Sequence, residues 1–153
     1  MKNFKEISLG LLILFTFISL ISFSQETYPF IENKGQLPTK VLSKVKVPSG
    51  AIFIEEGKFT YTFYNGRKLT EIHDLKTNDH QIEAHSFTSE FLNKNKNIEV
   101  ILEEESEYFE NFYIKNNFIN NVHFHKNVLQ KNIYNGIDLK MYYSKNNLKY
   151  DLI

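Results

Sequence analysis

The stretch AIFIEEGKFTYTFYNG (residues 51–66) decides the fold of this chain. Apolar residues alternate with other residues on both sides of the sequence EEGK, in which Gly57 permits a tight turn. After the turn, Phe59, Tyr61 and Phe63 share one face of an extended segment, because side chains alternate across a strand. The pattern predicts a β-hairpin with one apolar face.

Working outward, the same alternation recurs in short segments along the rest of the chain. These are AHSFTSEFL, NIEVILEE, EYFENFYI, NVHFH, LQKNIY, GIDLKMYY and LKYDLI. Stretches rich in Asn and Gly, such as NKNKN, KNNFINN, YNG and SKNN, separate them, and both residues tolerate the left-handed backbone of turns. No segment after the N-terminal one predicts a helix. We therefore expect an all-β fold, either an antiparallel β-sandwich or a partly open barrel.

The segment that precedes the hairpin is polar and irregular. Phe30 and Ile31 are apolar, after which Asn33 turns the chain, and Pro38 and Pro48 restrict this segment to edge or loop conformations.

The first 24 residues read as a helical signal peptide. Lys2 and Lys5 precede an uncharged apolar run, and Ser22 and Ser24 are small residues at the positions expected before a cut at Gln25. An uncleaved membrane anchor is the alternative, but the run is diluted by polar residues and falls short of about 20 apolar residues. We expect cleavage, leaving an all-β domain over residues 25–153 that is secreted or held at the cell surface.

Composition limits the function further. Of the 153 residues, 42% are hydrophobic and 24% charged, which is typical of a globular domain. Lys and Arg together number 18, as do Asp and Glu, so the neutral chain lacks the basic surface that a nucleic-acid partner requires. Cysteine is absent, which excludes disulfides, thiolate metal sites and a thiol nucleophile.

Three stretches of the sequence carry a resemblance to a known family. FIENKGQLP close after the signal peptide, with GAIFIEEGKFTYTFYN and the closing VLQKNIYNGIDLKMYYSKNNLKYDLI, resembles an uncharacterised (DUF7948-like) N-terminal domain of large secreted Bacteroidota proteins. Such proteins carry SBBP repeats, PKD-type modules, or a C-terminal domain for gliding motility and type IX secretion. The resemblance implies no assigned activity.

The resemblance also bears on the end of the chain, which stops on the apolar pair Leu152–Ile153. Relatives of this kind continue past the corresponding hairpin. We therefore expect the domain to be truncated at its C-terminal end, as a fragment of a longer protein, although a true short protein is the alternative. The expected partners are downstream modules of the same polypeptide or cell-surface glycans.

Candidate metal ligands are few. His123 and His125 form an H-x-H pair that would share one face of a strand, which is the spacing of a metal clamp. Other possible ligands upstream are His73, Asp74, Asp79, His80 and His85. A metal needs three or four convergent ligands, so we favour ordinary strand histidines and expect no metal and no cofactor.

Other polar and aromatic residues could in principle form a Ca²⁺, catalytic or sugar-binding site. The acidic run is Glu103, Glu104, Glu105 and Glu107, which we interpret as a solvated turn rather than a Ca²⁺ site. Asp138 and Asp151 lie in apolar strands that we expect to pair, and we interpret them as structural. The possible sugar-stacking rings are Tyr108, Tyr113, Tyr142 and Tyr143.

No phosphate loop, nucleophile elbow or zinc-protease motif occurs, so we predict no catalytic residues and no enzyme. The sequence favours a non-catalytic structural or adhesion-type module. A carbohydrate- or Ca²⁺-binding β-sandwich module is the alternative.

Overall fold

The computed structural model describes residues 27–114, 116–144 and 147–153, so the predicted signal peptide over residues 1–24 lies outside the described residues. The described part contains one helix, and all its strands join a single antiparallel sheet. The elements are β1 (Phe30–Glu32), β2 (Ser43–Val47), β3 (Gly50–Glu55), β4 (Lys58–Tyr64), α2 (Gly66–His73), β5 (Ala84–Glu90), β6 (Glu99–Ile114), β7 (Asn117–Tyr134), β8 (Ile137–Ser144) and β9 (Asn147–Leu152).

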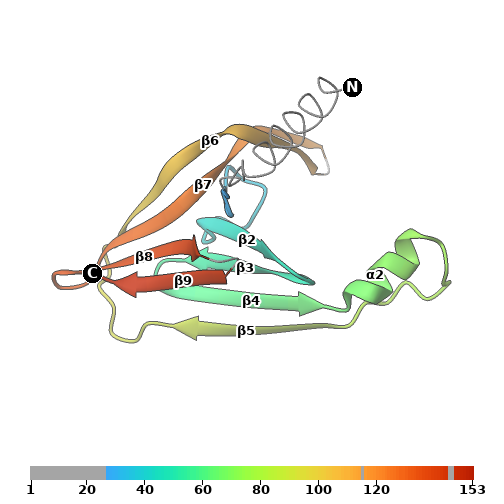
Figure 1. Ribbon diagram of the computed structural model, residues 1–153, viewed down its shortest axis with the longest axis horizontal. Helices are drawn as coiled ribbons and strands as arrows, with labels where there is room; N and C mark the ends of the chain where they lie inside the picture. The colour runs from blue at the N-terminus through green and yellow to red at the C-terminus, as the bar shows by residue number, and fades with distance from the viewer. Residues whose placement is uncertain (1–26, 115, 145–146) are drawn as a thin grey trace, which may run out of the picture.

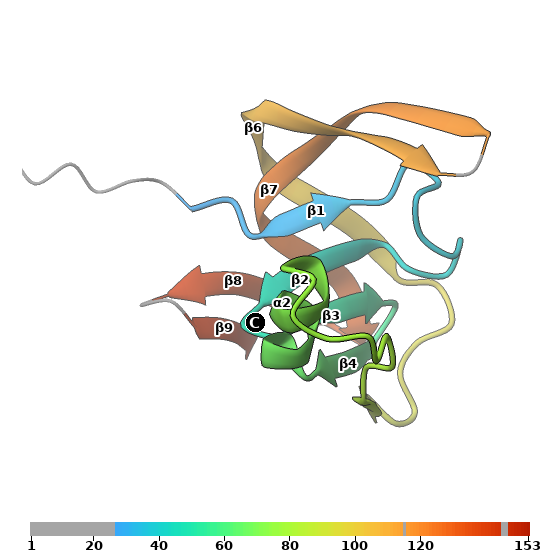
Figure 2. The same ribbon diagram turned by 90° about the vertical axis from the view of Figure 1, so that its right-hand side faces the viewer.

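The sheet follows the order β5-β4-β3-β2-β1-β7-β8-β9, and β6 pairs with the other edge of β7. Figures 1 and 2 show that it curls into an open half-barrel. The all-β prediction is therefore confirmed, and of the two architectures expected, the partly open barrel is the one observed. Curling gives the sheet a concave face, on which the core lies.

The hairpin predicted from residues 51–66 is present as β3 and β4. Ile52 lies opposite Tyr61, and Ile54 lies opposite Phe59, so the apolar residues of both strands share the concave face. Gly57 forms the turn with a φ of +55°, a conformation that disfavours residues with a Cβ.

The segments predicted as four short strands between residues 97 and 134 form instead two long ones. β6 has 16 residues and β7 has 18, and they pair as one hairpin from Glu99↔Lys131 to Ile114↔Asn117. The predicted separator KNNFINN and the predicted acidic turn are wrong, because most of the first and all of the second lie within these strands. The ladder absorbs Asn121 and Asn132, both with positive φ, at register shifts, whereas Glu104 has positive φ inside a stretch of constant register.

The prediction that the segment around Phe30 has only edge or loop character is also wrong. β1 lies inside the sheet, between β2 and β7 (Figure 2). It is three residues long and pairs with β7 only through Phe30↔His125 and Ile31↔Phe124. This short strand joins the β2–β5 half of the sheet to the β7–β9 half.

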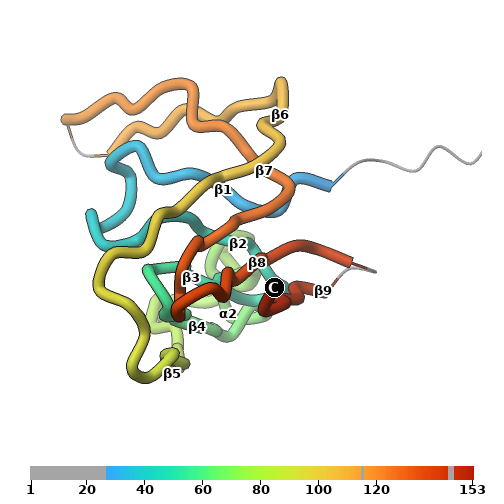
Figure 3. Tube along the Cα trace, turned by 90° about the vertical axis from the view of Figure 1, so that its left-hand side faces the viewer, coloured from blue at the N-terminus to red at the C-terminus, as the bar shows by residue number. Residues whose placement is uncertain are grey.

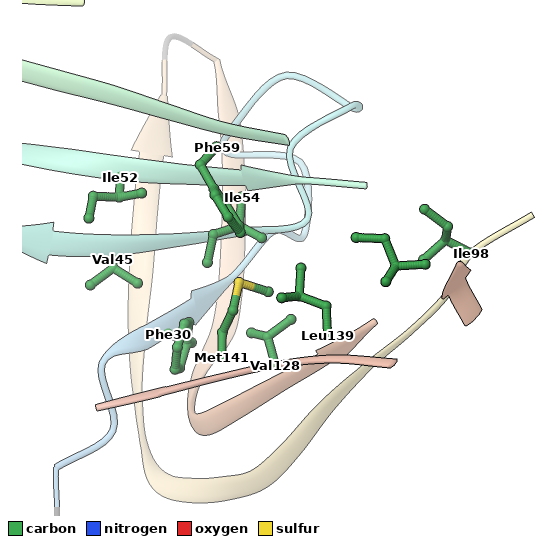
Figure 4. Packing of buried hydrophobic residues seen from close by; sticks show 10 residues of the cluster. Phe30, Val45, Ile52, Ile54, Phe59, Ile98, Val128, Leu139 and Met141 are labelled. Carbon is green, nitrogen blue, oxygen red and sulfur yellow. The ribbon is translucent and has the colours of Figure 1, made fainter. Parts of the chain in front are cut away.

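The core fills the concave face between these two halves. Figure 4 shows its side chains converging from both halves of the curled sheet. Its buried members are Phe30, Val45, Ile52, Ile54, Phe59, Ile98, Val128, Ile133, Leu139 and Met141. A buried amide connects the halves near one end, because the Gln130 side chain accepts from the Gly57 N–H (2.7 Å) and donates to the Glu55 carbonyl (3.0 Å).

The two ends of the concave face differ. At the end that carries Gly57, here called the closed end, residues 91–98 cross the opening, and the Asn95 N–H donates to the Ile133 carbonyl (2.9 Å). At the opposite end, here called the open end, β4 leads into α2 (Figure 1).

The helix α2 was not predicted. Asn65 caps its N-terminus by accepting from the Lys68 N–H (3.1 Å). None of its residues is buried. Its only aliphatic side chains are Leu69 and Ile72, which is too short an apolar stripe to predict a core-facing helix.

Candidate binding face

The open end of the concave face carries a cluster of aromatic rings in contact with one another. Tyr61 and Phe87 stack with their ring centroids 4.8 Å apart, and Phe63 and Phe87 are 6.4 Å apart. The Phe87 side chain is 48% exposed and that of Phe63 38%, while Tyr61 packs against the core. We call Tyr61, Phe63 and Phe87 the open-end rings. His85 lies beside them, 6.1 Å from Phe87.

Exposed rings that continue a core outward are typical of a contact surface, because a monomer gains by covering apolar area. Burial of the phenol and the nearby Tyr150 raise the pKa of Tyr61, which keeps its hydroxyl neutral. The sequence placed Tyr61 and Phe63 on one face of a strand, but it did not single out these rings as a site. Alternation reveals which face a ring shares and says nothing about what covers that face.

The histidine pair lies where β7 meets β1 and β6. His123 Nδ1 lies 3.0 Å from the Ser106 carbonyl oxygen and 3.5 Å from Glu105 Oε1. His125 is 5% exposed, and neither of its ring nitrogens has a hydrogen-bond partner among the described residues. Its Nε2 lies 4.0 Å from Glu32 Oε2.

Electrostatics at this junction keep the carboxylate charged and the buried imidazole neutral. Burial raises the pKa of Glu32, but the His123 backbone N–H (2.6 Å) and the Lys34 ammonium (2.8 Å) outweigh it, and the pKa lies below its ordinary value. Burial lowers the pKa of His125, despite the opposing effect of Glu32 and Glu105. His123 and His125 thus lie where β1 connects the two halves of the sheet.

The described residues bring together no group of three or more histidine, aspartate or glutamate side chains placed to hold a metal ion. His123 and His125 each approach a different carboxylate. The candidates further upstream are scattered: Asp74 is bonded to Lys76 (2.8 Å), and Asp79 to Lys68 (2.7 Å). The convergence that a metal site requires is therefore not found among the residues described.

The acidic run lies in β6, where cations from neighbouring strands pair with it. Glu103 lies 3.0 Å from Lys140, and Glu104 lies 3.0 Å from Lys126. Carboxylates already paired across a sheet are poorly suited to gather around Ca²⁺, which takes six to eight oxygen ligands.

The two strand aspartates each accept a hydrogen bond. Asp138 Oδ1 accepts from the Asn132 backbone N–H (2.7 Å) inside a register shift of β7. Asp151 Oδ2 accepts from the Tyr142 hydroxyl (2.9 Å), and this bond raises the pKa of Tyr142. The strands that carry them, β8 and β9, pair as expected.

The tyrosines proposed as sugar stackers separate into two groups. Tyr143 packs against the core, and Tyr142 is held by Asp151. Tyr108 is 79% exposed and Tyr113 80% exposed, and Tyr113 stacks on Phe118 with 4.6 Å between ring centroids. The β6–β7 hairpin thus carries a second patch of rings, apart from the open-end rings.

No helix in the described residues combines the length and the apolar character needed to cross a membrane.

Comparison with known proteins places this architecture in a family. The fold and its exposed rings define an all-β domain with an apolar surface that no described segment covers. More particularly, the model of a family described as a domain of unknown function, DUF7948, matches residues 30–153, and the chain belongs to that family. No curated protein and no solved structure matches the chain.

Proposed function

We propose that this chain is a non-catalytic structural or adhesion-type module of an exported bacterial protein. The observation that carries the proposal is the set of open-end rings, which extend the core to the surface at a place where no described segment covers them. A surface of this kind favours contact with another macromolecule over chemistry on a small substrate.

Export to the cell surface is part of the same proposal and is supported by the signal-peptide pattern of residues 1–24. We propose further that the domain belongs to a multidomain Bacteroidota protein of the kind with SBBP repeats, PKD-type modules or a type IX sorting domain. N-terminal sequencing of the exported product should begin at Gln25, and an intact Met1 in the membrane fraction would contradict cleavage.

Adhesion is tested by displaying the chain on a non-adherent bacterium and measuring attachment to protein-coated surfaces. Replacing Phe63 and Phe87 together by Ser should lower attachment severalfold. The matched control replaces Tyr113 and Phe118 together by Ser, which removes two rings from the second patch. Equal attachment by the unaltered chain and the Phe63/Phe87 variant would reject the open-end rings as the contact surface.

Glycan binding is a second candidate, favoured by the exposed Tyr113–Phe118 stack. An exposed planar ring is what a sugar face packs against. On a glycan array, binding that is lost in the Tyr113/Phe118 variant and kept in the Phe63/Phe87 variant would establish this role. An array without signal would leave the structural or adhesion-type role.

A further inference from the structure

The outer edge of β5 has unpaired backbone groups. The ladder between β4 and β5 runs without a register shift. At one end the Phe91 N–H donates to the Gly57 carbonyl (2.9 Å), and at the other the Asn65 N–H donates to the Glu83 carbonyl (3.1 Å). Because bonded pairs alternate along an antiparallel ladder, every second residue of β5 directs its N–H and C=O groups away from β4. No described strand pairs with this edge. The outward-directed residues are Ala84, Ser86, Thr88 and Glu90.

The side chains of β5 are exposed as well. This holds for all seven residues, and Figures 1 and 3 show the strand at the margin of the curled sheet, opposite the β6–β7 hairpin. Phe87, its middle residue, is 48% exposed although it stacks on Tyr61. A strand that is exposed along its whole length gains little from burial to offset the entropy of ordering it. Covering this edge with another chain would therefore stabilise it.

Among the described residues, two other strands have a partner on one side only, and these are β6 and β9. β6 carries six glutamates and no cation, and two register shifts interrupt its ladder with β7. β9 carries Lys149 and Asp151. Charges and bulges are the features with which natural edge strands resist pairing. Residues 84–89 of β5 contain no carboxylate, ammonium, bulge or proline, so this edge is the one open to pairing.

The edge of β5 is complementary to a second copy of itself. If two copies run antiparallel with Phe87 opposite the partner's Phe87, the whole strand is paired, because Phe87 is its middle residue. Ser86 then exchanges both backbone hydrogen bonds with the partner's Thr88. Glu90 lies opposite the partner's Ala84, so no two like charges meet. We propose that this chain forms a two-fold symmetric dimer by pairing β5 with β5 of a second copy.

The rings and the electrostatics favour a second β5 over a charged edge. In this register the two Phe87 rings occupy a position without backbone bonds, where opposite side chains approach most closely. Each ring already stacks on Tyr61 (4.8 Å), so the four rings would form one ladder across the two-fold axis. The edge of β6 would instead set carboxylates against these rings. A neutral edge therefore selects an equally neutral partner, and β5 itself is such a partner.

This inference rests on the proposed contact surface and names its partner, since Phe87 is one of the open-end rings. Seven residues and two rings from each copy make a small interface. We therefore expect a dimer that dissociates on dilution rather than an obligate one. On cells that display the chain, the same pairing would link neighbouring or facing copies.

A matched pair of double variants tests the proposal without altering the rings. Ser86→Lys with Thr88→Lys places Lys opposite Lys twice in the dimer, whereas Ser86→Lys with Thr88→Asp places Lys opposite Asp twice. Sedimentation velocity of the chain expressed from its full coding sequence in an exporting host should show a monomer–dimer equilibrium. The Lys/Lys variant should raise the dimer dissociation constant at least about tenfold. The Lys/Asp variant should dimerise at least as well as the unaltered chain.

A control separates the interface from the effect of net charge. Asn78→Lys with Gln81→Lys adds the same charge as the Lys/Lys variant at exposed positions outside β5, and it should dimerise normally. Circular dichroism checks that every variant is folded. A chain that stays monomeric at all concentrations, or a dimer that the Lys/Lys variant does not weaken, would overturn the proposal. Because these readouts are taken in solution, attachment to surfaces that still depends on Phe63 and Phe87 would leave the proposed function standing.

Cysteine pairs test the register independently, because the natural chain has no cysteine. In the proposed dimer, His85 lies opposite the partner's Ser89 with their Cα atoms about 4.5 Å apart, within the range that a disulfide spans. His85→Cys and Ser89→Cys chains should therefore form a covalent dimer on mild oxidation when they are mixed, and neither should do so alone. Crosslinking by either variant alone would refute the register, and crosslinking of Tyr150→Cys chains instead would assign the pairing to β9.

Discussion

At the closed end of the concave face, the Phe91 ring packs edge-on against Phe59 (6.1 Å), Tyr150 (5.9 Å) and Tyr134 (6.5 Å). At the open end, Phe87 stacks on Tyr61 and faces solvent. Both ends carry aromatic rings, and at both ends some of these rings come from β4 and from β5 or the residue that follows it. The difference is that, among the described residues, an irregular segment (residues 91–98) crosses the closed end and none crosses the open end.

The comparison shows that burial in a curled sheet depends on loops as much as on strands. Tyr134 donates its hydroxyl to the Leu92 carbonyl (2.8 Å), and the Asn95 side chain donates to the Asn132 carbonyl (2.8 Å). These bonds hold the crossing segment in place, so the rings beneath it contribute to stability. Rings at the open end should contribute little, and should be free to serve in contacts.

The largest effect is expected from a matched pair of truncations on β4. Phe59→Ala removes a ring that is 4% exposed and should lower the free energy of unfolding by about 3–5 kcal/mol. Phe63→Ala removes a ring that is 38% exposed and should cost about 1 kcal/mol or less. Urea unfolding followed by tyrosine fluorescence measures both. Similar losses would show that the open end is as much a part of the core as the closed end.

The next effect concerns the buried amide of the closed end. Gln130→Leu keeps the approximate size of the side chain but leaves the Gly57 N–H and the Glu55 carbonyl without this partner. The expected loss is about 2–3 kcal/mol, since unsatisfied buried polar groups cost more than a hydrogen bond gains. Gln81→Leu, at an exposed position, is the control. A loss no greater than the control's would mean that water replaces the amide.

A smaller effect is expected from lowering the pH, because His125 lies where β7 meets β1 and the two halves of the sheet join. Because burial lowers the pKa of His125 from its ordinary 6.5, the unfolded chain binds a proton at a higher pH than the native chain does. Stability should be complete above pH 6.5 and fall as the pH drops towards the lowered value, by at most about 1.4 kcal/mol per pH unit. Unfolding measured between pH 7.5 and 5.5 checks this.

The control for the acid effect is His125→Asn, in which the decline should flatten. Glu32 contributes in a lower window: its pKa is lowered from 4.5, so its stabilisation is present above that value and is lost as the pH falls further. An unchanged slope in the His125 variant would assign the acid sensitivity elsewhere.

The smallest effect is expected at α2, beyond the open end. Asn65→Ala removes the N-cap and should destabilise the helix by about 1 kcal/mol. Because no residue of α2 is buried, the change should open the helix locally and leave global unfolding almost unaltered. Amide exchange of residues 66–73 should quicken, with Asn78→Ala as the control. Slower global folding or a large loss of stability would contradict the peripheral place of the helix.

Much of the fold could be predicted from alternation, and the exceptions have physical causes. The β3–β4 hairpin and β5 were predicted because apolar and other residues alternate along each of these strands. The long β6–β7 hairpin was predicted as four short strands, because Asn tolerates a left-handed backbone both in turns and in bulges. Asn121 and Asn132, with φ of +53° and +61°, are bulge residues of a continuing strand.

The candidate site shows the same limit. His123 and His125 were found by their spacing, yet spacing could not show that each meets a different carboxylate from a different strand. Tyr61 and Phe63 were placed on the correct face, but the exposure of the open-end rings depends on the path of residues 91–98. That path is set by side-chain bonds of Asn95 and Tyr134, which no periodic pattern records.

The three residues of β1 have a consequence for how the chain folds. Phe30 pairs with Val45 on one side and with His125 on the other, so one neighbour is local and the other is far along the chain. The β2–β5 meander can form from nearby contacts as soon as it is synthesised, but the remaining edge of β1 must wait for β7. Closing so long a loop is entropically costly, and we expect the docking of the two halves through β1 to be the slow step of folding. Until then, the backbone groups of β1 that will pair with β7 have no partner strand, and a chaperone or a neighbouring chain can bind there.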